Sequence, residues 1–367
     1  MSANSESIGL AKGELETPAL CLDIEAYERN VGRMAGFIIG ECGVAWRPHM
    51  KGQKAPELAL RAVAAGAIGV TCATVYEAEA MAAAGVREIL IAHEITGARK
   101  CDRLARLQNV ANVISSTDSV DHARQLSEAA VRGGVTIPVL VEVDVGMGRC
   151  GIAPGEPAVN LAKWITTARG LRLAGIMGWE GHTIKYDPAE KEQQIRASMT
   201  TLVSTAELCR AAGLSIGIVS AAGSGTFLHS CRMKGITEVQ AGGGVFSDLS
   251  YQKWGLAEHD FALTVLARAV SRPSPVKIIV DAGFKALSFQ HGYPKALGMR
   301  NVKSIVLSAE HGTIELDEPS VEPRVGDVVE FVPGYTDSTL CLHDEMCVLR
   351  DGRVEAVWTI PGRGGRR

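Results

Sequence analysis

A basic segment in the first part of the chain holds the residues best suited to covalent chemistry. It reads Arg-Pro-His-Met-Lys-Gly-Gln-Lys from Arg47 to Lys54, with His49 and Lys51 at its centre. A lysine at the end of a strand can project into a barrel mouth, where its pKa can fall and its amine can attack an aldehyde. Taken alone, the segment also fits a solvated basic turn, because three of its eight residues are Lys or Arg. The rest of the chain must decide between these interpretations.

Two later segments end apolar runs with side chains that could face the same cavity. The turn from Asp144 to Gly151 contains glycines that would let Arg149 point back over the strand ends. The next run ends at Trp179 and is followed by His182, and a flat indole there could stack on a planar cofactor. Each residue also has a plainer interpretation, as a surface arginine, a core tryptophan and a structural or solvated histidine.

Two glycine-rich loops follow the last two apolar runs of this region. Small residues and hydroxyls at the start of a helix make an anion site, because backbone N–H groups converge there. Consecutive glycines let the backbone approach a bound group closely. Phosphate sites of this kind are common after strands seven and eight of an eightfold barrel. The residues concerned are Ser220, Gly223, Ser224, Gly225 and Thr226 in the first loop, and Gln240, Gly242 and Gly243 in the second.

A reactive lysine, a flat ring and a phosphate site together indicate pyridoxal 5'-phosphate as the cofactor. In this interpretation Lys51 forms the Schiff base and the glycine loops hold the phosphate.

The elements that must position these residues alternate regularly. Apolar runs typical of strands occur at 44–47, 69–73, 88–92, 112–115, 137–145, 173–179, 216–220 and 236–240, and Ala-rich helical patterns fill most intervals. Such alternation requires parallel strands joined by right-handed crossovers. Eight units over about 200 residues favour a closed (β/α)8 barrel over an open sheet. We therefore expect an α/β chain with a cofactor-binding barrel at 24–257.

The pattern changes after residue 257. Strand-like runs at 262–270, 276–281, 303–308, 327–332 and 345–349 are separated by Gly, Pro and Asp, with only weak helical periodicity. We expect an all-β C-terminal domain at 258–367, joined by an N-terminal strand at 16–23. The basic tail from Gly362 is expected to be disordered.

Composition narrows the possible functions. A net charge of −3 over 367 residues implies no general affinity for nucleic acid or an anionic membrane. No apolar stretch has the length of a membrane span, and residues 1–14 lack the apolar core of a signal peptide. The nine cysteines include no Cys-x-x-Cys pair, so we expect reduced core residues of a cytoplasmic protein.

From about Thr17 to Gly362 the sequence resembles the fold-type III pyridoxal phosphate enzymes, the alanine-racemase-like barrels. Within them it is most similar to the D-threonine aldolase, D-serine dehydratase and 3-hydroxyaspartate aldolase group. The resemblance implies that Lys51, not Lys54, carries the cofactor and that Arg149 lies beside its phenolic oxygen. It also implies that Gln240 faces the pyridine nitrogen and that the enzyme is a homodimer. Glu310-His311-Gly312 matches a C-terminal signature of the group.

One segment departs from this family. Its metal segment, Pro-x-His-x-Asp or Pro-x-His-x-Cys, stands here as Pro333-Gly-Tyr335-Thr-Asp337. A phenol with a pKa near 10 is a poor ligand for a divalent ion at neutral pH. Asp337 with waters could still hold a hard ion such as Mg²⁺ or Mn²⁺, whereas Zn²⁺ needs more nitrogen or sulfur ligands. We therefore expect any metal to be weakly bound.

These observations lead to a functional hypothesis with three alternatives. The resemblance implies a lyase that cleaves β-hydroxy-D-amino acids, of the D-threonine or 3-hydroxyaspartate type, to glycine and an aldehyde or glyoxylate. Asp337 or His311 would accept the proton of the β-hydroxyl. The alternatives are a dehydratase of D-serine or 3-hydroxyaspartate, a racemase with Lys51 and Tyr335 as its two bases, and a non-catalytic cofactor carrier.

Overall fold

The computed structural model describes residues 6–364, and within them the chain divides into two compact units. One unit comprises residues 33–242 with Gly364, and the other comprises residues up to Gly32 together with 243–363. Residues 365–367 of the predicted disordered tail lie outside the described part. The domain bounds expected from the sequence, 24–257 and 258–367, stay predictions.

Eight parallel strands form the sheet of the first unit, which confirms the predicted barrel class. Their order is β2-β9-β8-β7-β6-β5-β4-β3, and a further parallel bridge between His49 and Thr71 links the two ends of this order. The strands are β2 (Ala45–Trp46), β3 (Val70–Cys72), β4 (Glu88–Glu94), β5 (Asn112–Thr117), β6 (Ile137–Glu142), β7 (Leu171–Met177), β8 (Ile218–Ala221) and β9 (Glu238–Val239).

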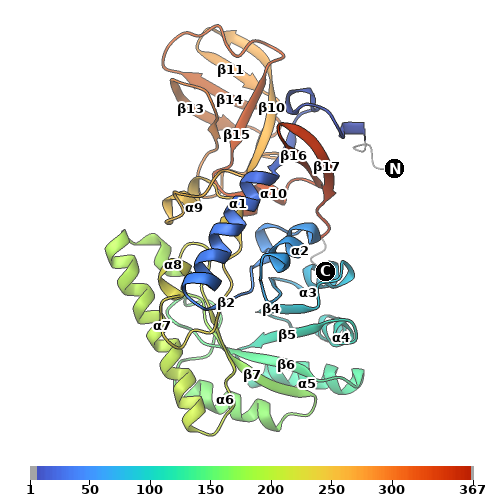
Figure 1. Ribbon diagram of the computed structural model, residues 1–367, viewed down its shortest axis with the longest axis vertical. Coiled ribbons are helices and arrows are strands. Elements are labelled where there is room, and N and C mark those ends of the chain that lie inside the picture. The colour runs from blue at the N-terminus through green and yellow to red at the C-terminus, as the bar shows by residue number, and fades with distance from the viewer. Residues whose placement is uncertain (1–5, 365–367) are drawn as a thin grey trace. The chain divides into compact units, whose positions relative to one another are not determined.

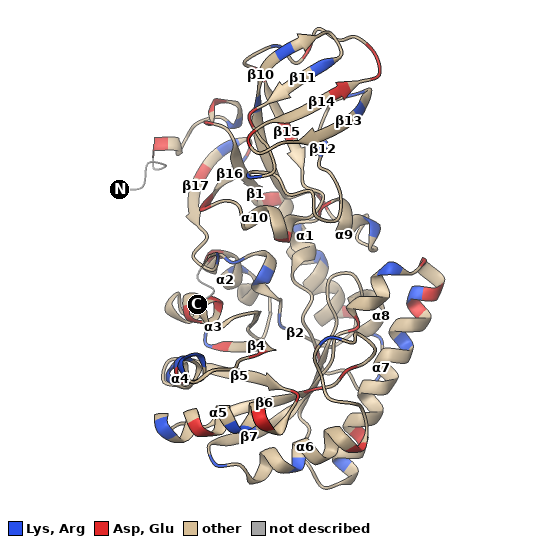
Figure 2. Ribbon diagram, turned by 180° about the vertical axis from the view of Figure 1, so that it is seen from behind, with Lys and Arg blue, Asp and Glu red and all other residues tan. Residues whose placement is uncertain are grey.

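Helices follow most of these strands and lie outside them (Figure 1). They are α2 (Pro56–Ala64), α3 (Val75–Ala83), α4 (Ala98–Leu107), α5 (Val120–Gly133), α6 (Glu156–Thr167), α7 (Pro188–Ala211) and the short α8 (Phe227–Ser230). Figure 2 shows acidic and basic residues mixed along α7, whereas the strands are mostly uncharged. Helix α7 therefore buries apolar residues, among them Ile195, Met199 and Leu202, and presents most of its charged residues to solvent.

Local signals explain where these helices begin and end. The side chains of Thr74, Ser119 and Asp187 accept hydrogen bonds from the first turns of α3, α5 and α7. Gly134 ends α5 in the left-handed conformation, with φ of 64°. Helix α1 (Ile24–Ala35) directly follows residue 23 and continues as a π-helical segment, η3 (Gly36–Glu41).

The second unit is built on a mostly antiparallel sheet. Its strands are β1 (Ala19–Asp23), β10 (Leu263–Ser274), β11 (Lys277–Val280), β12 (Lys295–Ala296), β13 (Val302–Leu307), β14 (Gly312–Leu316), β15 (Val328–Val332), β16 (Glu345–Arg350) and β17 (Arg353–Thr359). The N-terminal strand β1 lies between β10 and β16 in this sheet. Two short helices, α9 (Leu249–Lys253) and α10 (Thr336–Leu340), belong to the same unit.

Two predictions from the composition can be compared with the structure. None of the nine cysteines, all within residues 6–364, forms a disulfide bond; six are buried as expected of core residues, whereas Cys42, Cys150 and Cys341 are partly exposed. Within residues 6–364 no helix is both long enough and apolar enough to cross a membrane.

A buried ion pair fixes the seam between β2 and β9. Arg47 Nε lies 3.2 Å from a carboxylate oxygen of Glu238, and the two side chains are only 5% and 3% exposed. We expect Glu238→Gln to lower the free energy of unfolding by about 3 kcal/mol, because it leaves a buried guanidinium without a counter-charge. Urea unfolding measures this. The double variant Arg47→Met/Glu238→Leu should recover most of the loss, and a single-variant cost below about 1 kcal/mol would contradict the assignment.

Candidate functional site

The indole of Trp179 brings together two of the predicted cations. Lys51 Nζ lies 5.3 Å from the ring centroid, and the guanidinium carbon of Arg149 lies 4.8 Å from it. Both distances are within the range of cation–π contacts. Trp179 follows β7, Arg149 follows β6, and Lys51 lies in a 3-10 turn, Met50–Gly52, after β2. The carboxyl ends of three strands therefore meet at one ring.

The two lysines of the basic segment lie in different electrostatic environments. Lys54 is buried and forms an ion pair with the buried carboxylate of Glu77. Lys51 is partly exposed, and within residues 6–364 neither it nor Arg149 forms an ion pair. Lys54 is thus neutralised by a structural partner, while Lys51 remains available to a ligand.

The first glycine loop, from Ser220 to Thr226, is held by its own hydroxyl groups. The Gly223 N–H donates to Thr226 Oγ1 at 3.0 Å, and the amide of Gln240 donates to Ser220 Oγ at 2.9 Å. Ser224 is buried in the same loop and Gly225 follows it. The predicted helix start is present, but α8 has only four residues, so its dipole contributes little and the loop N–H groups must dominate.

The second loop lies against the lysine segment. A Cβ atom on Gly242 would lie 2.2 Å from the His49 carbonyl oxygen, so only glycine fits there. The Gln53 amide donates to the Gly242 carbonyl at 3.0 Å. Burial and the positive charges of Lys51 and Lys54 lower the pKa of His49, so its imidazole is neutral and accepts from the Lys51 N–H. Gly243, the next residue in the chain, begins the second segment of the other compact unit.

His182 lies beside the arginine turn. A Cβ atom on Gly146 would lie 3.0 Å from His182 Nε2. The Nδ1 atom of His182 is buried and has no hydrogen-bond partner among the described residues.

The first unit fits the predicted cofactor. Two cations that pair with no carboxylate of the described chain lie at one flat ring, and glycines remove side chains where the backbone must come close. A Cβ atom on Gly223 would lie 3.1 Å from the indole nitrogen of Trp179, so this loop also runs close to the ring. These features match what a phosphorylated aromatic aldehyde requires.

In the second unit, Asp337 is held by two phenols. Tyr335 donates to Asp337 Oδ2 at 2.9 Å, and Tyr251 donates to Asp337 Oδ1 at 3.0 Å. Burial and the Asp337 charge raise the pKa of both tyrosines, so both phenols stay protonated at neutral pH. Both oxygens of the carboxylate therefore already accept a hydrogen bond.

Aromatic rings surround this phenol–carboxylate group. Tyr335 lies with its ring centroid 5.7 Å from Tyr251, 5.8 Å from Trp254 and 4.9 Å from His291. Tyr251, Trp254 and His291 were not among the residues predicted from the sequence. Tyr251 and Trp254 follow the Gly-rich loop at 242–244 by fewer than a dozen residues. This closeness in the sequence is the signal that could have pointed to them.

Two further expectations concern His311 and a metal ion at Asp337. His311 is exposed in the turn between β13 and β14, and its backbone carbonyl accepts from Ser308. Within residues 6–364 no group of three His, Cys, Asp or Glu side chains could hold a metal ion. The residues around Asp337 thus do not fit a divalent metal.

Comparisons with known proteins identify the family of the chain. The family model "Alanine racemase, N-terminal domain" matches residues 22–249, and "Putative serine dehydratase domain" matches residues 262–349. The chain is 35% identical to a D-threonine aldolase of Arthrobacter sp over 357 residues, covering 96% of this chain and 94% of that protein. It is 34% identical to a 3-hydroxy-D-aspartate aldolase of Paracoccus denitrificans (strain Pd 1222) over 367 residues, covering 97% and 94%.

A solved structure is also similar over nearly the whole chain. The crystal structure of a D-threonine aldolase from Filomicrobium marinum has a TM-score of 0.94 and 35% identity, with 97% of this chain and 98% of that chain covered.

Removing Lys51 tests the cofactor cluster. We expect Lys51→Ala to lose the cofactor absorbance band that borohydride abolishes, because the Lys51 amine faces the indole and is not committed to a carboxylate of the described chain. Lys54→Arg should keep that band, since a guanidinium at this position can still pair with Glu77. If the Lys54 variant loses the band and the Lys51 variant keeps it, the assignment of the two lysines is wrong.

Metal analysis tests the Asp337 group. We expect the purified protein to contain less than stoichiometric Zn²⁺, Mn²⁺ or Mg²⁺ after dialysis, because no group of three His, Cys, Asp or Glu side chains within residues 6–364 could hold the ion and the phenols beside Asp337 stay protonated. Tyr335→His should increase Mn²⁺ affinity by at least about tenfold, since imidazole binds at neutral pH without losing a proton. Calorimetry measures this affinity, with Tyr335→Phe as the matched control. Stoichiometric metal in the dialysed native protein would refute this prediction.

Proposed function

The chain belongs to the alanine-racemase-like family of pyridoxal phosphate enzymes, and we propose that it is a lyase acting on β-hydroxy-D-amino acids. The proposed reaction cleaves the Cα–Cβ bond and yields glycine with an aldehyde or glyoxylate. The named aldolase relatives support the reaction class. The protonated state of Tyr335 supports a lyase over a racemase, because a neutral phenol cannot take the proton from Cα.

The first unit supplies the cofactor site in this proposal. Pyridoxal phosphate, when bound, supplies an aldehyde for amine attachment and a ring that withdraws electrons from Cα. Lys51 would hold the cofactor through its amine, which the substrate amine could replace. Trp179 would pack against the cofactor ring and Arg149 would bind its phenolic oxygen, while His49 orders the lysine turn. Gln240 would face the ring nitrogen, and residues 220–226 with Gly242 and the adjacent Gly243 would bind the phosphate.

The second unit supplies the candidates for the base. Cleavage of Cα–Cβ requires removal of the proton on the β-hydroxyl. Tyr335 can receive that proton on its phenolic oxygen while passing its own to Asp337, since the two are already hydrogen-bonded. His311 is the second candidate base. The proposal needs no metal at Asp337.

Dehydration is the second candidate reaction. The model "Putative serine dehydratase domain" matches residues 262–349, which contain Tyr335, Asp337 and His311. A dehydratase would remove the Cα proton and expel the β-hydroxyl as water, so the hydroxyl would need an acid rather than a base. Tyr335 is then the candidate acid, because its phenol stays protonated.

A racemase and a non-catalytic carrier have less support. Racemisation needs a base on each side of the ring that takes a proton from carbon. A hydroxyl proton can pass through the hydrogen-bonded phenol of Tyr335 to Asp337, but a phenol that stays protonated is not a base for the Cα proton. A carrier would not need the second unit, which adds a sheet of its own and the Asp337 group.

We also propose a homodimer in the cytoplasm. The family resemblance supports the dimer, and nine reduced thiols support a reducing compartment. Light scattering of the purified protein tests the dimer.

Product analysis tests the proposed reaction. We expect D-threonine or a 3-hydroxyaspartate isomer to yield glycine at a rate that EDTA does not change, because the Asp337 group does not fit a metal. An oxo acid with ammonia would identify a dehydratase, and a mirror-image amino acid would identify a racemase. Turnover of none of D-threonine, D-serine and the 3-hydroxyaspartates, with cofactor bound, would contradict the lyase.

Substitutions of the phenol–carboxylate group test the base. Asp337→Asn should lower kcat by about a hundredfold or more, because the amide cannot accept the relayed proton. Tyr335→Phe should have a similar effect. His311→Asn is the matched control and should change kcat little. The opposite pattern would assign the base to His311.

A further inference from the structure

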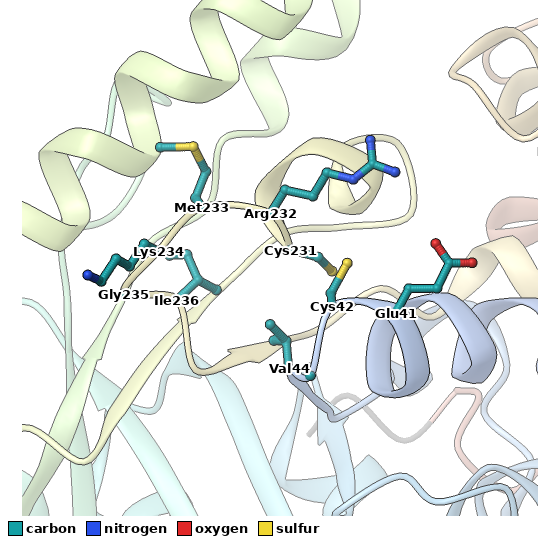
Figure 3. Close-up of a pocket in the computed structure, with 10 residues that line it drawn as sticks. Glu41, Cys42, Val44, Cys231, Arg232, Met233, Lys234, Gly235 and Ile236 are labelled. Carbon is teal, nitrogen blue, oxygen red and sulfur yellow. The ribbon is translucent and has the colours of Figure 1, made fainter.

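A pocket in the first unit lies at the amino ends of strands β2 and β9. The predicted cofactor residues lie at the opposite, carboxyl ends of the barrel strands. The pocket has a volume of about 440 Å³ and is lined by residues 41–44 and 231–236. Residues 41–44 precede β2, and residues 231–236 precede β9. Cys42 and Cys231 both line it, and their thiols point toward each other (Figure 3). This pair plays no part in the proposed reaction.

Aromatic packing holds the two cysteines in place. Phe37 in η3 and Phe227 in α8 meet edge to face, with centroids 5.7 Å apart, and Arg232 lies 5.1 Å over the Phe37 ring. Cys42 and Cys231 are the residues that directly follow η3 and α8, and each N–H donates back into its own helix at 3.0 Å. The two helix ends are thus fixed side by side.

The two thiols differ in accessibility. Cys42 is partly exposed, whereas Cys231 is 4% exposed. Burial and the adjacent Cys42 thiol raise the pKa of Cys231, so it stays protonated and is a slow nucleophile by itself. A reagent that enters the pocket therefore reaches Cys42 first.

We propose that Cys42 and Cys231 form a dithiol site that anionic, low-molecular-weight disulfides oxidise to an intramolecular disulfide bond. The Cys42 thiolate attacks one sulfur of the small disulfide and releases one small thiol. Cys231 then attacks the Cys42 sulfur and releases the second. Two electrons pass from the protein to the small disulfide, and the two protein protons end on the two released thiols. The contact between the two thiols makes the second step intramolecular and therefore fast.

The charges around the pocket select the reagent. Arg232 and Lys234 line it with one carboxylate, Glu41, so positive charge prevails. An anionic disulfide such as oxidised glutathione is therefore attracted more than a cationic one such as cystamine.

The position of the site connects it to the cofactor segments. Cys231 ends the helix that follows the loop 220–226, and Cys42 lies just before β2, which leads to Lys51. A disulfide would join these two segments at the end away from Trp179. It would also restrict the unfolded chain over a long loop, which stabilises the folded state.

Oxidation followed by peptide mapping tests the proposal. The holoenzyme is incubated with oxidised glutathione, alkylated, digested and analysed by mass spectrometry. We expect a Cys42–Cys231 cross-linked peptide, with the other seven cysteines alkylated, and a slower reaction with cystamine. The unfolding temperature should rise on oxidation and return with dithiothreitol.

Three variants make the result specific. Cys209→Ser removes a buried cysteine of α7 and should leave the cross-link unchanged. Cys42→Ser should prevent any reaction of Cys231, and Cys231→Ser should stop at a stable glutathione adduct on Cys42. The proposal is overturned if the native protein retains that adduct with Cys231 alkylated, or if both cysteines are recovered alkylated.

Discussion

The seam between β2 and β9 determines where the lysine lies. The indole of Trp46 donates to the Ala241 carbonyl at 2.7 Å, and the His49 N–H donates to the Gln240 carbonyl at 3.0 Å. Gly242 continues this contact, because any side chain there would collide with the backbone of His49. Strand pairing between the first and last strands of the barrel thus places the Lys51 turn and the second glycine loop side by side.

Ion pairing near the carboxyl ends of the barrel strands determines which cations can contact a ligand. Burial and the neighbouring Glu94 raise the pKa of Glu142. A second buried negative charge close to Arg149 is thereby disfavoured. Because Lys54 is paired with Glu77, Lys51 and Arg149 remain the cations at Trp179. The balance favours an anionic ligand such as a phosphate.

The barrel and the meeting of Lys51 and Arg149 at Trp179 were predictable because strand ends in this fold converge by topology. Alternating apolar runs place Lys51, Arg149 and Trp179 on one face without any knowledge of their contacts. The pairing of Lys54 with Glu77 was not predictable, since it depends on how the helix after β3 packs. Likewise, Tyr251 reaches Asp337 across 86 residues, and no local pattern encodes that contact. The Cys42–Cys231 pair also depends on packing between distant segments.

Replacing an imidazole by a phenol changes what the Asp337 carboxylate can do. A metal ion acts on a hydroxyl through its positive charge, and needs ligands with free lone pairs. Two protonated phenols bring no charge, and they use both carboxylate oxygens as acceptors. Each phenolic oxygen can still accept a proton while the phenol donates its own proton to the carboxylate. The same arrangement that disfavours a metal therefore provides a path for a proton to the carboxylate, and Tyr251 keeps that carboxylate oriented toward Tyr335.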